Sequence, residues 1–430
     1  MRRSLSVLLL ILAVPAASGA SAAPAHADAA QRPVVFVHGS AGSALQFQTQ
    51  AKRLASNGYP ASRIEAHDYD STFATESIEQ IYARLDARIA RLLAETGADK
   101  VDLLGHSLGT FMAQGYLATP GRAATVAHYV NLDGRTATEP PGGVPTLAVW
   151  GEGSTARTIV GATNVYFSDQ AHTQVVTSPE TFVEIYKFFR GKAPATTRVL
   201  PQPPGHLSLS GRAVLFPTNV GVAGARLEVY RLNPFTGARR ALVHSETLAA
   251  DGSFGPLRAL GFARYEFAVV REGAATHHFY FQPSVRTDNL IRLLTGVPGQ
   301  GLDALTEKSD HHTNLVISRN KEWWGDQGDV LYVNGENILN AANSPRTKRV
   351  IGIFAYDRNV DRTTDLSAPI PAFFAQTFIT GMDVYIPAAP AHHGIASVVA
   401  LPRTGGIDVV NVPNWPSTTN RITIQFNDFD

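Results

Sequence analysis

Val101-Asp102-Leu103-Leu104-Gly105-His106-Ser107-Leu108-Gly109 is the stretch that decides how the first half of the chain folds. Its opening apolar run predicts a buried strand, and the apolar positions from Phe111 to Leu117 predict a helix after it. The G-x-S-x-G pattern between them predicts a tight turn, because a Cβ at either glycine would collide with the neighbouring strand or helix. Such a turn holds the Ser107 hydroxyl clear of the backbone, which is typical of a nucleophile elbow.

Strand-like and helix-like segments alternate on both sides of this turn, between residues 33 and 197. Short apolar runs predict five buried strands, at Val34–Val37, Val101–Leu104, Ala127–Leu132, Thr146–Trp150 and Asn164–Phe167. Apolar residues at helical spacing predict helices over 47–55, 78–93 and 111–117, and a last helix that begins at Ser178-Pro179. This alternation is typical of an α/β protein, in which helices cover both faces of a mostly parallel sheet.

The pattern changes after the proline-rich segment at residues 201–205. From His206 onward, short runs alternate polar and apolar residues and are separated by turns such as Asp251-Gly252, which predicts an all-β region. We predict four segments from these changes: a signal peptide at 1–27, an α/β catalytic domain at 28–197, a β-sandwich-like lobe at 198–285 and a second β-rich lobe at 286–430.

Length and composition indicate a globular protein with more than one domain. The chain has 430 residues, of which 44% are hydrophobic and 17% are charged, and a single core rarely grows to this size. Its 37 basic and 36 acidic residues give a net charge of +1, which argues against a nucleic-acid partner. Because the sequence has no cysteine, it has no disulfides, thiolate nucleophiles or cysteine-ligated metals.

The first 27 residues have the three parts of a secretory signal peptide. Arg2 and Arg3 supply positive charge, residues 8–14 lie in an apolar core, and Ala25-His26-Ala27 has the small-x-small pattern that precedes a cleavage site. The apolar core is too short to span a bilayer, and no later stretch approaches that length. We therefore predict a secreted, extracellular protein without a transmembrane segment.

A serine hydroxyl becomes a good nucleophile only when a base removes its proton, and histidine is suited to this near neutral pH. In a fold of this type, the base follows the last strand of the sheet. His172 lies there, between the strand ending at Phe167 and the helix beginning at Ser178. We predict His172 as the base. Four other histidines of the first half fit the role less well by chain position: His38, His67, His106 and His128.

A carboxylate should orient the imidazole and stabilise its charged form. Its usual place follows the strand at Thr146–Trp150, where the sequence reads Gly151-Glu152-Gly153 and has no aspartate. Asp133 ends the preceding strand and gives the chain order serine, aspartate, histidine. We favour Asp133 as the acid; Glu152 is the alternative acid, and a helix or turn cap is the alternative role of Asp133.

Two backbone N–H groups are needed to hold the oxyanion that forms on an attacked carbonyl. Leu108, directly after the serine, is the first predicted donor. Ser40 is the second, because it follows the His38-Gly39 pair in the loop after the first strand. The glycines of this loop could also serve only to make a tight turn, and the two roles are compatible.

Pairs of aromatic and histidine residues stand out in the β region. Trp323-Trp324, Phe373-Phe374 and Tyr280-Phe281 could be exposed anchors for an interface, although such pairs more often belong to a core. His311-His312 and His392-His393 are poor metal ligands, since adjacent side chains on a strand point in opposite directions. We predict no metal ion and no cofactor.

These motifs resemble the α/β-hydrolase superfamily and, within it, the archaeal long-chain lipase family, in which a lipase domain carries a C-terminal β-rich domain. The similarity is strongest over residues 38–59, 98–134 and 161–202, and it is most specific at Gly161–Phe167 and Thr177–Phe182. It implies an α/β-hydrolase fold followed by an all-β region. The site roles that it implies are Ser107 as nucleophile, Asp133 as acid, His172 as base, and Ser40 and Leu108 as oxyanion donors.

Two features depart from the family. Its long lid insertion is largely missing, because Asp70 leads through Phe73 almost directly into the helix expected from Thr75. Ser40 and Leu108 also replace bulkier or softer residues of the family pattern, which would reshape the acyl pocket. The resemblance therefore implies ester hydrolysis more strongly than a preference for long-chain lipids.

From these observations we expect a serine carboxylic-ester hydrolase, a lipase or esterase, that forms an acyl-enzyme intermediate. Its substrate would be an ester or lipid, which it could meet at a lipid–water or polymer interface. A missing lid favours the neighbouring alternatives, a polyester depolymerase or a short-chain esterase with an open site. A non-catalytic protein that binds lipid or polymer surfaces is the remaining alternative.

Overall fold

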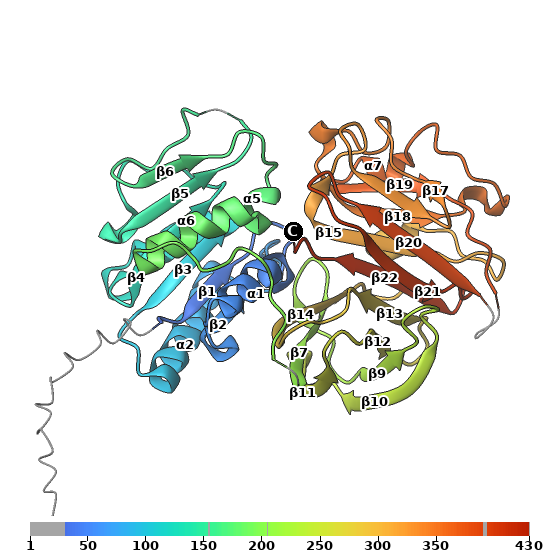
Figure 1. Cartoon of the computed structure of the whole chain (residues 1–430), viewed down its shortest axis with the longest axis horizontal. Helices are drawn as coiled ribbons and strands as arrows, with labels where there is room; N and C mark the ends of the chain where they lie inside the picture. The colour runs from blue at the N-terminus through green and yellow to red at the C-terminus, as the bar shows by residue number, and fades with distance from the viewer. Residues whose placement is uncertain (1–30, 154, 204, 390–393, 430) are drawn as a thin grey trace, which may run out of the picture. The chain divides into compact units, whose positions relative to one another are not determined.

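Six parallel strands form the sheet predicted for the first half of the chain (Figure 1). Their order is β2-β1-β3-β4-β5-β6. The strands are β1 (Val34–Val37), β2 (Ile64–His67), β3 (Val101–His106), β4 (Val126–Leu132), β5 (Thr146–Trp150) and β6 (Thr163–Tyr166). Every residue of β1, β3 and β5 is buried, as expected of strands covered on both faces. All five predicted strands are present, although no residue of β6 is buried, and β2 is an addition.

Helices cover the two faces of this sheet. The helices of this half are α1 (Gln48–Ser56), α2 (Ile78–Thr96), α3 (Leu108–Leu117), α4 (Pro120–Ala123), α5 (Gln174–Thr177) and α6 (Pro179–Arg190). Phe36 packs in one core cluster with residues of α1, α5 and α6, whereas its neighbour Val35 packs in another with residues of α2 and α3. Because successive strand residues point to opposite faces, α1 and α6 cover one face and α2 and α3 the other. The predicted α/β-hydrolase architecture is confirmed.

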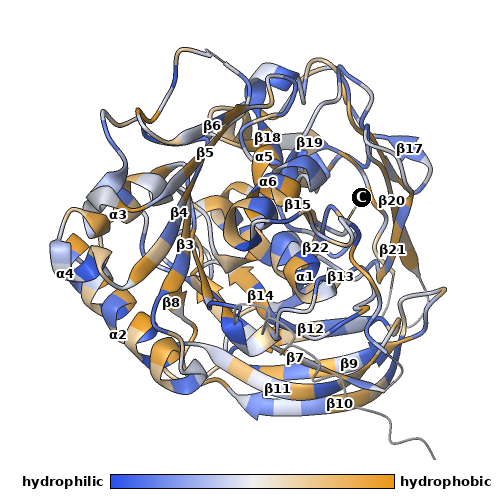
Figure 2. Ribbon diagram, turned by 60° about the vertical axis from the view of Figure 1, so that its left-hand side comes forward, coloured by the Kyte–Doolittle hydropathy of each residue, from blue (hydrophilic) through white to orange (hydrophobic). Residues whose placement is uncertain are grey.

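The long helix α2 shows how local sequence sets such an element. Ser77 and Gln80 form a capping box at its start, and Gly97 ends it in the left-handed conformation. The buried residues Ile81, Leu85, Ile89 and Leu92 recur at helical spacing, and hydrophobic and hydrophilic residues follow one another along the helix in Figure 2. The helix begins at Ile78, where its predicted apolar stripe begins and three residues after Thr75. Asp70 holds the preceding turn by accepting hydrogen bonds from the N–H groups of Thr72, Ala74 and Thr75.

The computed structural model describes residues 31–153, 155–203, 205–389 and 394–429. The predicted signal peptide and the His392-His393 pair therefore lie outside the described residues. Residues 32–430 form one compact unit. Within the described residues, no helix has the length and apolar character needed to cross a bilayer.

The C-terminal region consists mostly of strands, as predicted. One eight-stranded sheet has the order β10-β9-β12-β13-β22-β15-β18-β19, and two smaller sheets contain β11-β7-β14 with β8, and β17-β16-β20-β21. The strands are β7 (His206–Leu215), β8 (Val220–Gly221), β9 (Arg226–Leu232), β10 (Arg239–Thr247), β11 (Ser253–Leu260), β12 (Tyr265–Val270), β13 (Thr276–Phe281), β14 (Asp288–Thr295), β15 (Leu315–Trp323), β16 (Val330–Val333), β17 (Glu336–Asn337), β18 (Val350–Tyr356), β19 (Ile379–Asp383), β20 (Ile395–Leu401), β21 (Asp408–Pro413) and β22 (Asn420–Phe426). A short helix, α7 (Pro371–Phe374), precedes β19.

Two pairings connect the predicted β lobes. β22 lies between β13 and β15 and is parallel to both, so strands from both lobes share one sheet. β14 follows the predicted boundary near residue 285 but pairs with β7 of the first lobe. The domain boundaries stay a prediction. Trp323, Trp324, Phe373 and Tyr280 are buried, so these members of the aromatic pairs belong to the core.

Candidate active site

Ser107 occupies a sharp turn between β3 and α3. Its φ of 50° and ψ of −119° lie in a region that residues with a Cβ rarely adopt. A Cβ added at Gly105 would lie 2.6 Å from the Gly109 oxygen, and a Cβ added at Gly109 would lie 2.2 Å from the Val37 oxygen. The two glycines therefore allow the strand, the turn and the helix to approach closely, which is the packing a nucleophile elbow requires.

Asp133 and His172 are in contact. His172 Nδ1 and Asp133 Oδ2 are 2.6 Å apart, and the other carboxylate oxygen accepts hydrogen bonds from Gly151 N at 3.0 Å and Arg157 Nη1 at 2.7 Å. Burial alone would raise the pKa of Asp133, but the hydrogen bond with His172, the Gly151 amide and the Arg157 charge lower it to about 2. Asp133 is therefore ionised near neutral pH and can stabilise a charged imidazole.

The alternative acid, Glu152, is engaged elsewhere. Its two carboxylate oxygens accept hydrogen bonds from Nε of Arg346 at 3.1 Å and Nε of Arg349 at 3.0 Å. Of the two carboxylates considered at the sequence level, the described structure joins only Asp133 to His172. This geometry supports Asp133 as the acid.

Ser107 lies beside this pair. Its backbone N–H donates a hydrogen bond at 3.1 Å to the oxygen of Leu132, the residue before Asp133. The Nε2 atom of His106, the residue before Ser107, forms a hydrogen bond of 2.9 Å with His172 O. The His106 and His172 ring centroids are 4.6 Å apart. Among the hydrogen bonds of the described residues, none links the Ser107 hydroxyl to the His172 ring. The catalytic roles of these residues therefore stay a prediction.

The two predicted oxyanion donors flank the serine. Leu108 is the first residue of α3, where an N–H has no partner within the helix. Ser40 lies on the turn after β1, and an added Cβ at the adjacent Gly39 would come within 3.1 Å of the Ser107 Cβ. Within the described part of the chain, neither amide donates a hydrogen bond. Both N–H groups are thus available for an oxyanion.

The competing histidines have structural partners. His38 is buried, accepts the Tyr69 amide at 3.1 Å and stacks on the Tyr69 ring, while burial lowers the pKa of its imidazole. Burial lowers the pKa of His106 to about 3, and His67 contacts Ile81 O at 3.1 Å. His128 pairs with Asp102 at 2.8 Å. These contacts give no reason to prefer any of them over His172 as the base.

Family models match three parts of the chain. The model for lipase (class 2) matches residues 31–126, the model for a lipase C-terminal domain matches residues 205–298, and a further C-terminal domain model matches residues 301–430. The first match covers the strand, turn and helix around Ser107 within the α/β sheet described above. The chain is a lipase of the α/β-hydrolase superfamily with a C-terminal domain. It is therefore a carboxylic ester hydrolase, with an ester or lipid as substrate.

Solved structures also resemble the lipase at low identity. Lipase B of Aspergillus fumigatus is 15% identical, with a TM-score of 0.30, over 39% of this chain and 54% of that chain. A predicted CIB-like hydrolase from Thermoplasma acidophilum is 17% identical, with a TM-score of 0.28, over 38% of this chain and 89% of that chain. MGS-MChE2, an alpha/beta hydrolase from the metagenome of Moroccan lagoon sediments, is 17% identical, with a TM-score of 0.28, over 37% of this chain and 91% of that chain.

Arg157 is a site residue that the sequence analysis missed. Besides its contact with Asp133, it donates from Nη2 to Gly134 O at 3.1 Å and lies 4.7 Å from the Trp150 ring centroid. It therefore contacts the carboxylate oxygen of Asp133 that His172 does not contact. No sequence pattern pointed to it, because the loop after β5 has no motif of its own.

The C-terminal region of the lipase also reaches the His172 loop. Glu322, in β15, is fully buried and accepts hydrogen bonds from Thr173 N at 2.6 Å and Gln174 N at 3.1 Å. Phe378, which precedes β19, lies 6.2 Å from the His172 ring, with the two ring planes 9° apart. Glu322 therefore fixes the two residues that follow the predicted base, and is a candidate positioning residue.

Glu322→Ala should lower kcat about a hundredfold and Glu322→Gln about tenfold, because a displacement of about 1 Å in a catalytic group can cost two orders of magnitude. Glutamine keeps one oxygen to accept an N–H group, so it should recover part of the activity. KM on a soluble ester should change much less than kcat, since Glu322 contacts the loop and not the substrate. Steady-state kinetics on both variants would measure this split.

Exposed Glu336 provides the matched control, and Glu336→Gln should behave as wild type. Melting temperatures of all variants separate loss of positioning from loss of folding. A Glu322→Ala variant that stays folded and keeps wild-type kcat would show that this carboxylate does not position His172.

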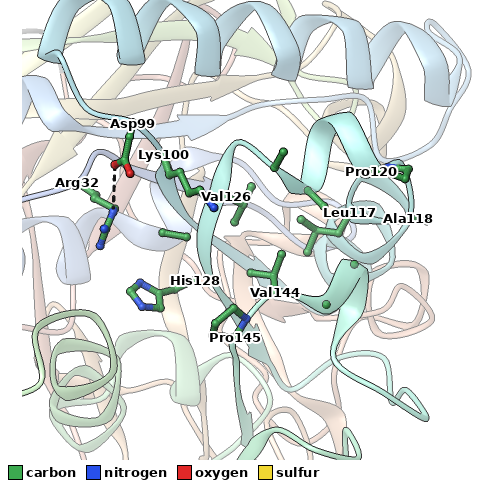
Figure 3. Close-up of a pocket in the computed structure, with 15 residues that line it drawn as sticks. Arg32, Asp99, Lys100, Leu117, Ala118, Pro120, Val126, His128, Val144 and Pro145 are labelled. Atoms are coloured by element: carbon green, nitrogen blue, oxygen red, sulfur yellow. Dashed lines mark ion pairs between the residues drawn. The ribbon is translucent and has the colours of Figure 1, made fainter.

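One large hollow of the lipase does not lie at the predicted site. It has a volume of about 750 Å³, and Figure 3 shows His128 and the ion-paired Arg32 and Asp99 among its lining residues. Lys100, Val126 and Pro145 place it at the amino ends of β3, β4 and β5. Ligands of parallel α/β sheets bind at the carboxyl ends, where Ser107 and Asp133 lie.

A second hollow adjoins the predicted site. Its volume is about 560 Å³, and its lining includes Glu152, Arg346, Arg349 and Phe378. Phe378 is also the ring that stacks on His172, so one residue connects the hollow with the predicted base. Ligand sites are concave and commonly lie where domains meet, and this hollow is lined from both halves of the chain.

Proposed function

We propose that this lipase is a secreted serine hydrolase in which Ser107, His172 and Asp133 form the catalytic triad. The contact between His172 and Asp133, directly beside the strained turn of Ser107, is the observation that carries the proposal. Secretion is supported by the charged, apolar and small-residue segments of residues 1–27.

In the first step, the Ser107 hydroxyl oxygen attacks the carbonyl carbon of the ester while His172 takes the hydroxyl proton. Asp133 accepts the Nδ1 hydrogen bond and stabilises the imidazolium, as its lowered pKa favours. The N–H groups of Ser40 and Leu108 hold the oxyanion. His172 then gives its proton to the departing alcohol oxygen, the ester C–O bond breaks, and an acyl-enzyme remains.

In the second step, a water molecule attacks the acyl carbon while His172 takes one of its protons. The same two N–H groups hold the second oxyanion. The bond between the acyl carbon and the Ser107 oxygen breaks, the serine recovers its proton from His172, and the acid is released. The enzyme returns to its starting state without a cofactor.

An open site favours the alternative of a polyester depolymerase or short-chain esterase. The segment between β2 and α2 spans only residues 68–77, and Asp70 organises it as a turn. Together with the 560 Å³ hollow beside His172, this short segment supports access for bulky chains. This alternative uses the same triad and differs only in the substrate.

Two measurements on the purified protein test the proposal. An organophosphonate should label one residue, Ser107, as found by mass spectrometry of peptides. Lipid or polymer binding without labelling would favour the non-catalytic alternative. Hydrolysis rates on esters with two, eight and sixteen acyl carbons, and on a polyester film, then assign the substrate: a maximum at two or on the film supports the open-site alternative, and a maximum at sixteen supports a long-chain lipase.

A further inference from the structure

Another cavity, distinct from the two hollows described above, lies in the C-terminal region and shares no lining residue with the site around Ser107. Its volume is about 200 Å³, or about seven water volumes at ~30 Å³ each. Arg271 follows β12, whereas Arg421 is the second residue of β22 and Asn314 precedes β15. The residues thus come from both matched C-terminal domains, and ligand sites favour such junctions.

The charged lining residues leave an excess of positive charge. Arg271, Arg421 and Lys308 line the cavity together with one carboxylate, Asp303. Asp303 pairs with Lys308 Nζ at 2.9 Å, and its other oxygen is 3.7 Å from Arg421 Nη1. Asp310 reaches the lining residue Thr418 but is itself exposed and outside the lining. Three positive charges therefore share one carboxylate within the described lining, and such an excess of charge is costly in a partly buried site.

Several polar groups of the cavity also have unused hydrogen-bonding capacity. The Arg421 side chain is 18% exposed, and within the described residues its guanidinium donates no hydrogen bond. Arg271 donates from Nη1 to Gly296 O at 2.8 Å and from Nη2 to Thr295 Oγ1 at 3.1 Å, but its Nε is buried without a partner. Asn314 Oδ1 is likewise buried without a partner.

These features match one ligand chemistry. A guanidinium presents its donors in a planar fork that fits the oxygens of a carboxylate or phosphate. Burial lowers the pKa of both Arg271 and Arg421, and a bound anion would offset that cost.

We propose that this cavity binds a small ligand through a carboxylate or phosphate group, with Arg421 and Arg271 as the anion donors. The proposal is independent of ester hydrolysis at Ser107. It gives the C-terminal region a recognition role of its own, separate from the support that Glu322 gives to the His172 loop.

Isothermal titration of the Ser107→Ala protein tests the proposal without interference from hydrolysis. Glucuronate represents the carboxylate, glucose 6-phosphate the phosphate, and glucose the uncharged control. At least one of the two anions should bind and glucose should not, and added sodium chloride should weaken the binding. The anion that binds more tightly identifies the preferred group.

Arg421→Gln should raise the Kd of that anion at least about tenfold, because a hydrogen bond to a charged group is lost. Arg240→Gln is the matched control, since Arg240 is exposed on β10, and its Kd should not change. Ester hydrolysis and melting temperature, measured with Ser107 intact, verify folding. If Arg421→Gln does not fold, Arg271→Gln replaces it with the same expectation. Failure of both anions to bind at millimolar concentration, or equal Kd values in the folded cavity variant and the control, would overturn the proposal.

Discussion

Ser107→Ala should leave a folded protein whose ester hydrolysis falls to background. The substitution removes the attacking oxygen and keeps the Cβ, so the turn at φ 50° holds the same backbone conformation. Loss of the nucleophile in related triads lowers kcat by a factor on the order of 10⁴ to 10⁶. Release of p-nitrophenol from a butyrate ester, with stopped-flow detection for wild type and long incubation for the variant, covers this range.

Ser367→Ala is the matched control for this prediction, because Ser367 is an exposed serine without a role in the proposed mechanism. It should hydrolyse the ester at the wild-type rate. The melting temperature of Ser107→Ala should lie within a few degrees of wild type, which separates loss of chemistry from loss of fold. Turnover by Ser107→Ala at a rate close to wild type would reject the assignment of the nucleophile.

Asp133→Asn should have the second largest effect, with kcat lowered by a factor on the order of 10⁴, as in a serine protease whose triad aspartate was changed in this way. An asparagine can turn its NH₂ group toward His172 Nδ1, which stabilises the wrong tautomer of the imidazole. It also removes the negative charge that now accepts from His172, Gly151 and Arg157. Steady-state kinetics on the same soluble ester measure the loss.

Glu152→Gln is the comparison that decides between the two carboxylates. Glu152 accepts hydrogen bonds from Arg346 and Arg349 in the C-terminal region. The Glu152→Gln variant should therefore retain ester hydrolysis within a few-fold of wild type. A large loss in Glu152→Gln together with near wild-type activity in Asp133→Asn would reverse the assignment of the acid. Circular dichroism of both variants confirms that each is folded.

The architecture of the first half could be predicted because local sequence patterns indicate its strands and helices. β5 occupies the predicted residues 146–150, and the last helix begins after Ser178 as expected. β2 was not predicted, since its four residues, Ile64–His67, alternate apolar and polar groups over too short a run. It forms because β1 offers it a parallel partner along its whole length.

In the candidate site, too, some residues could be predicted from the sequence and others could not. Ser107 and Leu108 follow from one contiguous motif, and Asp133 and His172 follow from their places after successive strands. Glu322 could not be found in this way, because it acts through the amides of Thr173 and Gln174, about 150 positions earlier in the chain. Arg157 lies in a loop without regular structure, so only the folded chain brings its side chain to Asp133.

The position of β22 in the sheet limits how early during synthesis the eight-stranded sheet can form. A ribosome delivers the neighbours β13 and β15 well before residues 420–426, so each keeps an unpaired edge until the last strand arrives. Exposed edges of this kind favour misassembly while the chain is incomplete. Residues 420–426 must therefore be translated before the eight-stranded sheet can close.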